Sequence, residues 1–194
     1  MNVLQKNVDS SLYVDDFLLC YRSNARVDAI ERQLQLQLHK LEAWANENGF
    51  KFSPHKTVGV HFCCKHSCVR EPDLFLGNQR LPFQNQARFL GVIFNKRLTF
   101  LPHIKDLRLR CQNALNVLKV LSNPEWGGDT EHLLHLYHSL IRSKLDYGCA
   151  VYGSASKSNL RMLDPIQNQG LRLALGAFRT SPVESLQAEA NEPS

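Results

Sequence analysis

The hydrophobic pattern of this 194-residue chain changes near residue 98. Before that point, short extended runs of apolar residues alternate with one helical segment. After it, apolar residues recur at three- and four-residue steps, the spacing typical of amphipathic helices. The pattern therefore predicts an α+β fold: antiparallel strands with one long helix in the first half, and helices alone in the second.

The first strands are predicted at 12–14 and 17–21, meeting at Asp15-Asp16. Two acidic residues inside an apolar and aromatic run have low strand propensity and favour a tight turn. An apolar stripe from Val27 to Ala45 then predicts a helix of about six turns. It is expected to end at Asn48-Gly49, where glycine supplies a left-handed cap.

Extended structure is expected to return over residues 50–62, with a break at Ser53-Pro54. The polar stretch 65–79 is typical of a loop or hairpin and contains a short apolar strand at 74–76. Residues 89–94 form an apolar run of the length of a buried strand.

Helices are predicted in the second half at 102–121, 133–145 and 160–175. Breaks at 123–128 separate the first two. The tail, 179–194, has two prolines and little periodicity, so we expect it to be loosely held.

Composition excludes several classes of protein. With 43% hydrophobic and 21% charged residues, the chain is too apolar to be disordered, and it lacks the ~20-residue apolar run of a membrane-spanning helix. The amino terminus has neither a secretory signal nor a transit-peptide pattern, so an intracellular, reducing location is expected. There the six cysteines are predicted to be thiols or metal ligands rather than disulfides.

A cluster of cysteine and histidine over 61–68 offers five potential zinc ligands in eight residues. Zinc sites usually combine two ligand pairs separated by a dozen or more residues, and no second pair follows. Thiols at the end of a strand are the favoured interpretation, and a zinc knuckle is the alternative.

The net charge of +5 is concentrated in one segment. Residues 1–95 carry +2, residues 96–119 carry +5 and residues 120–194 carry −2. The basic residues of the middle segment are Lys96, Arg97, Lys105, Arg108, Arg110 and Lys119, against Asp106 alone. This density favours contact with a phosphate backbone, although a solvated basic face without a partner is the alternative.

The sharpest local motif is Tyr13-Val14-Asp15-Asp16. Adjacent carboxylates on a tight turn repel one another unless a divalent cation relieves the repulsion. Hard oxygen ligands of this kind suit Mg²⁺, so Asp15 and Asp16 are candidate metal ligands. Considered alone, the motif is also compatible with an ordinary Asp-containing turn.

The order of motifs resembles the reverse transcriptases of non-LTR retrotransposons, the Jockey-like branch especially. Residues 11–17 are similar to the catalytic hairpin of the palm in that family, and residues 49–57 to the motif that follows it. Residues 89–94, continued through Leu98 to Ile104, are similar to the primer-grip hairpin that leads into the thumb. Three later segments resemble the helical region that follows the polymerase core: 140–148, 167–173 and 176–186.

The resemblance implies a role for each of these parts. It implies an RNA-directed DNA polymerase that uses two Mg²⁺ ions, an RNA template and a DNA primer. Asp15 and Asp16 would be catalytic, and Lys56 would protonate the leaving pyrophosphate. Phe89, Leu90 and Gly91 would form the primer grip, and the basic residues of 96–119 would contact nucleic-acid phosphates. The implied regions are the end of a palm (1–97), a helical thumb (98–155), and a post-thumb helix with a loosely ordered tail (156–194).

The family's third catalytic carboxylate and its fingers have no counterpart here. Asp9 is the only acidic residue upstream of the hairpin, and no matching motif surrounds it. We therefore expect a fragment that is inactive alone, with an open sheet edge and low stability in its first 95 residues. The alternative is a non-catalytic nucleic-acid-binding remnant that uses the basic thumb helix.

Overall fold

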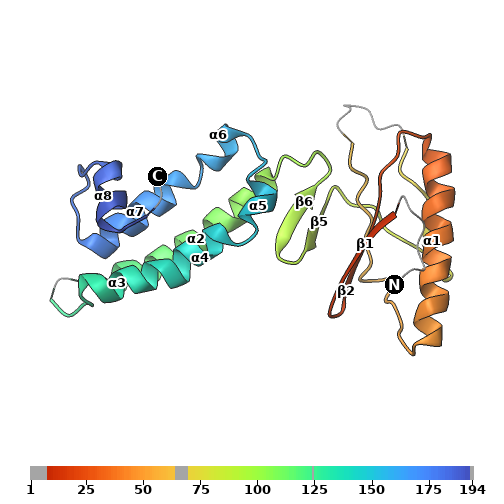
Figure 1. The fold of residues 1–194 in the computed structure, drawn as a ribbon, viewed down its shortest axis with the longest axis horizontal. Coiled ribbons are helices and arrows are strands. Elements are labelled where there is room, and N and C mark those ends of the chain that lie inside the picture. Colours follow the sequence, from red (N-terminus) through yellow and green to blue (C-terminus); the bar gives the residue numbers. More distant parts are fainter. Residues whose placement is uncertain (1–7, 64–69, 124, 193–194) are drawn as a thin grey trace. The chain divides into compact units, whose positions relative to one another are not determined.

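The computed structural model describes residues 8–63, 70–123 and 125–192 (Figure 1). The chain forms two compact units, residues 1–98 and residues 99–194, here called the N-terminal unit and the C-terminal unit. The first combines strands with one long helix and the second is helical, so the predicted α+β class is confirmed. No helix in the described part of the chain is both long and apolar enough to cross a bilayer.

The N-terminal unit begins with an antiparallel hairpin of β1 (Val8–Tyr13) and β2 (Asp16–Tyr21). Tyr13 pairs with Asp16, which leaves Val14 and Asp15 as the two-residue loop. The turn was predicted one residue too late, because Asp16 already belongs to β2. The following helix, α1 (Val27–Glu47), ends where the sequence predicts, at Asn48 and a left-handed Gly49 with φ 74°.

The core of this unit lies between α1 and the short hairpin of β3 (Phe75–Leu76) and β4 (Gln79–Arg80). Its residues are Leu38, Leu74, Leu76 and Leu81, with Leu19, Leu34, Phe52 and Phe83 packed against them. Gln35 on α1 is bonded twice to the backbone of Phe75: its Nε2 donates to the carbonyl at 2.9 Å, and its Oε1 accepts from the N–H at 2.8 Å. The predicted extended segment 50–62 forms only an isolated parallel bridge, between Gly59 and Phe83.

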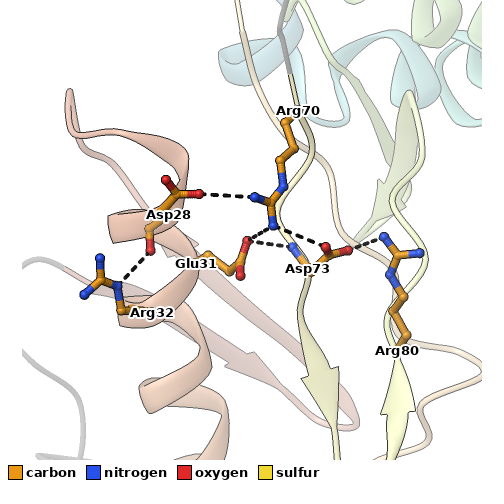
Figure 2. Close-up of polar contacts among 6 residues, drawn as sticks. All are labelled: Asp28, Glu31, Arg32, Arg70, Asp73 and Arg80. Atoms are coloured by element: carbon orange, nitrogen blue, oxygen red, sulfur yellow. Dashed lines mark hydrogen bonds and ion pairs between the residues drawn. The ribbon is translucent and has the colours of Figure 1, made fainter.

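A network of ion pairs centred on Arg70 joins the segment before β3 to the start of α1 (Figure 2). The Arg70 guanidinium lies 3.3 Å from Asp28, 3.2 Å from Glu31 and 3.3 Å from Asp73. Asp73 also pairs with Arg80, and the hydrogen bond from Arg80 lowers the pKa of the Asp73 carboxyl. Because most of these side chains are exposed, water weakens each pair.

A third hairpin, of β5 (Gln86–Phe89) and β6 (Val92–Asn95), replaces the single strand predicted over 89–94. The chain reverses at Leu90 and Gly91, with φ of 44° and 78°. Positive φ at both central residues suits the twist of a two-residue hairpin. The apolar pattern alone did not reveal this turn, because Leu90 continues the apolar run, whereas the family resemblance implied a hairpin here.

The C-terminal unit consists of helices. Their bounds are α2 (Leu101–Leu121), α3 (Thr130–Tyr137), a π-helical turn η1 (His138–Arg142), α4 (Ser143–Asp146), α5 (Cys149–Tyr152), α6 (Lys157–Leu160), α7 (Asp164–Leu175) and α8 (Val183–Glu189). Ile104, Leu107, Leu115, Tyr137 and Leu171 are at most 1% exposed and form its core.

The tail is not loosely held, so that prediction was wrong. Helix α8 buries Leu186 to 2% exposure. Beyond it, the nearly buried Glu192 carboxylate lies 3.1 Å from Arg142 and 3.2 Å from His138. The sequence could not reveal these pairs, because their partners lie about 50 residues away along the chain.

The prediction that the cysteines are thiols or metal ligands rather than disulfides is confirmed only in part. Cys20, Cys111 and Cys149 are free, and burial raises the pKa of the Cys111 thiol. Cys63 takes part in a disulfide, so the expectation is wrong there. The zinc alternative involves Cys64, His66 and Cys68, which lie outside the described residues.

Candidate functional site

The Asp15 and Asp16 carboxylates lie at the tip of the first hairpin, and both residues are exposed. Exposure alternates along β2: Phe17 and Leu19 are half-buried, whereas Asp16 and Leu18 are exposed. Leu19 packs against the core of the unit, so Asp16 faces the opposite side of the hairpin. Both acidic groups are therefore presented to solvent.

Val14, which precedes them, has a φ of 52° and is 82% exposed. A β-branched residue seldom adopts this left-handed conformation, because its side chain crowds the backbone. Backbone strain of this kind clusters at active sites and ligand-binding loops. A two-residue hairpin loop usually needs a residue with positive φ, so a correctly placed turn would have predicted the strain at Val14. The turn was predicted at Asp15-Asp16 instead, and so that strain was not predicted.

Asp9 cannot complete a metal site with this pair. It lies on β1 opposite Cys20, four residues before Tyr13, so it stands about 13 Å from the hairpin tip. No cluster of three or more His, Cys, Asp or Glu side chains suited to a metal occurs among the residues that the structure describes. Asp15 and Asp16 fit a Mg²⁺ ion that takes its remaining oxygens from water or substrate phosphates.

Lys56 is exposed on a tight turn that follows α1. The turn is closed on the Ser53 carbonyl, which accepts from the Lys56 N–H at 3.2 Å and from the Thr57 hydroxyl at 2.8 Å. Just before it, the ring of Phe52 lies 5.9 Å from the ring of Phe17 on β2. This contact links the segment that carries Lys56 to the strand that carries Asp16.

The predicted primer-grip residues form the tip of the β5–β6 hairpin. Phe89 pairs with Val92, and Leu90 with Gly91 makes the turn. Leu90, like Val14, is a bulky residue with positive φ. The β1–β2 and β5–β6 hairpins, for which the sequence predicts functions, thus both have a strained non-glycine residue in the turn.

The six basic residues of 96–119 are divided between the two units: Lys96 and Arg97 belong to the N-terminal unit, and the other four lie on α2. Lys96 lies 3.4 Å from Glu71, and the Arg110 Nε lies 3.0 Å from Asp106. Arg97 is exposed in the N-terminal unit. The other three, Lys105, Arg108 and Lys119, are exposed on α2 and have no acidic partner among the described residues.

These three residues share one face of α2. At about 100° per residue they lie within about 60° of one another, whereas Arg110 lies about 140° from Lys105. Lys105, Arg108 and Lys119 therefore form an exposed basic face of α2, and phosphate binding by the six basic residues stays a prediction.

Comparison with known proteins gives relatives over most of the chain. It is 32% identical over 160 residues to the probable RNA-directed DNA polymerase from transposon BS of Drosophila melanogaster, covering 82% of this chain. It is 29% identical over 192 residues to a putative 115 kDa protein in the type-1 retrotransposable element R1DM, covering 98% of this chain. It is 26% identical over 184 residues to the polymerase from mobile element jockey, covering 93%.

The chain spans only 18% to 20% of the length of these three relatives. No family model and no solved structure matches it. All three relatives come from a transposon, a retrotransposable element or a mobile element, and two are named as RNA-directed DNA polymerases. By sequence, the chain is similar over most of its length to one segment of the Jockey-like reverse transcriptases of non-LTR retrotransposons.

Proposed function

We propose that this segment carries the catalytic hairpin, the primer grip and the thumb of an RNA-directed DNA polymerase. The observation that supports this most is the strained Val14-Asp15 turn, which presents Asp15 and Asp16 to solvent. In this proposal residues 1–97 complete a palm, residues 98–155 form the thumb, and residues 156–194 follow it. The substrates are an RNA template and a DNA primer, within the cell.

Asp15 and Asp16 would hold Mg²⁺ through their carboxylate oxygens. When bound, the metal lowers the pKa of the primer hydroxyl and stabilises charge on the departing pyrophosphate. Lys56 would donate a proton to that pyrophosphate. Phe89, Leu90 and Gly91 would hold the primer end in place.

The α2 face of Lys105, Arg108 and Lys119 would neutralise phosphates of the template–primer backbone. Such contacts position a duplex without reading its sequence. Each phosphate neutralised adds about 0.9 to the slope of log affinity against log salt. Replacing the three residues with glutamine should therefore flatten that slope by between two and three.

In this proposal Asp15 and Asp16 are two of the three carboxylates that the family uses, so the chain alone should not extend a primer. The decisive experiment is a chimera in which this segment replaces the corresponding part of the jockey polymerase. The chimera should copy an RNA template with Mg²⁺, and Asp15→Asn should abolish the activity.

Asp9→Asn is the matched control, since Asp9 lies on the same hairpin but far from its tip. It should leave the chimera active. Equal loss from both variants, or primer extension by the isolated chain that Asp15→Asn abolishes, would contradict the proposal.

A second candidate function is nucleic-acid binding without catalysis, as in a remnant. The observation that favours it is the α2 face, whose three cations have no acidic partner among the described residues. An inactive chimera, together with salt-dependent binding by the isolated chain, would support this candidate.

A further inference from the structure

The segment 176–186 resembles the family, but it lies outside the proposed palm and thumb, and those regions give no role to its exposed residues. Most of its residues have a structural role. Gly176 ends α7 with a φ of 63°, Pro182 precedes α8, and Leu186 is buried to 2% exposure. Phe178, Arg179 and Thr180, in the connecting loop, have no such role.

Phe178 is 83% exposed, the largest fraction among the exposed large apolar side chains of the described residues. Hydrogen bonds hold the loop that presents it. The Arg172 guanidinium donates to the Ser181 carbonyl at 3.1 Å and to the Asn168 carbonyl at 3.3 Å. The Ser181 N–H donates to the Phe178 carbonyl at 3.1 Å, so a hydrogen-bonded turn closes the loop.

Arg179 is exposed beside Phe178 and has no acidic partner within the described part of the chain. The residues around it, such as Thr180, Pro182 and Glu184, are exposed and not strongly apolar. A stable protein interface needs about 800 Å² from each partner, usually around a buried apolar centre. The surface formed by the Phe178 ring and the neighbouring Arg179 cation is too small for such an interface. Its size matches a single base with its phosphate.

We propose that the 176–181 loop binds an unpaired nucleotide of a nucleic-acid strand, with the base stacked on Phe178 and the phosphate next to Arg179. This rests on the proposed function, because it assumes a chain that handles nucleic acid. It adds a second contact point, distinct from the α2 face and directed to single strands.

The test is a binding titration of the full chain with a fluorescent single-stranded RNA and with an abasic strand of equal length. Phe178→Ala should weaken binding to the RNA on the order of fivefold to tenfold and leave abasic binding unchanged. Phe178→Trp should retain or improve RNA binding. Arg179→Gln should lower the salt slope by about 0.7 on both strands.

The matched control is Phe75→Ala, a surface phenylalanine of the other unit that is 43% exposed. It should not alter binding. Thermal melts should show Phe178→Ala folded as the parent chain is, because the ring is exposed.

The outcomes separate the two proposals. If the parent chain binds with a salt slope set by the α2 face but Phe178→Ala has no effect, the loop proposal is wrong and the proposed function stands. If Phe178→Ala weakens both strands equally, stacking is excluded. If the parent chain binds neither strand, both fail.

Discussion

The two units differ in how they are held together. The C-terminal unit has a continuous core in which Ile104, Leu115 and Leu171 are fully buried. The N-terminal unit has a smaller core and joins the start of α1 to the segment before β3 through exposed ion pairs at Arg70. Its first hairpin leaves Leu12, Tyr13 and Val14 more than half exposed. The C-terminal unit is therefore built as a self-contained bundle, and the N-terminal unit as a part that presents surface to other groups.

The largest expected difference concerns the core. Leu115→Ala should destabilise the C-terminal unit by about 2–5 kcal/mol, the range for a fully buried leucine. Leu74→Ala, in the smaller core of the N-terminal unit, should cost less. Urea unfolding followed by separate probes of each unit would measure both, and equal losses would contradict the comparison.

Alkaline pH should destabilise the C-terminal unit selectively. Burial raises the pKa of Tyr137 and of Tyr152 to about 12, from 10. The unfolded chain therefore releases these protons first, and stability present below pH 10 is lost between pH 10 and 12. Melting temperatures across this window should fall less steeply in Tyr152→Phe, and an unchanged slope would oppose the assignment.

One buried amide in the N-terminal unit should be replaceable with a gain. Gln37 on α1 is fully buried, and neither its Nε2 nor its Oε1 has a hydrogen-bond partner among the residues that the structure describes. An unsatisfied buried polar group costs about 1–3 kcal/mol. Gln37→Met should therefore raise the melting temperature, whereas Gln35→Met, which breaks two bonds to Phe75, should lower it.

The smallest effect is expected at the ion-pair network. Arg70→Gln should cost about 1 kcal/mol or less, because the Arg70 and Asp28 side chains are more than half exposed. The loss should shrink further in 1 M salt. A loss above 2 kcal/mol that resists salt would show that these pairs hold the unit together.

Sequence reasoning succeeded where one short-range pattern decides the structure. The stripe from Val27 to Ala45 predicted α1 to within a residue or two, because packing on one face sets a helix. It failed at Leu90, where an apolar residue lies in a turn, and at Glu192, whose partners are distant in sequence. At the hairpin it identified the acidic pair but missed the strain at Val14, because strain depends on register rather than on composition.

Gly170 on α7 lies so close to Tyr137 that a Cβ atom there would stand 2.7 Å from its ring. Even alanine would force the helices apart, at a cost that grows with every atom added. In a set of diverging genomic copies of an element, the residue at position 170 should therefore indicate whether a copy can still encode this fold. We expect copies that still encode a folded product to keep glycine there, and copies that no longer do so to be able to replace it.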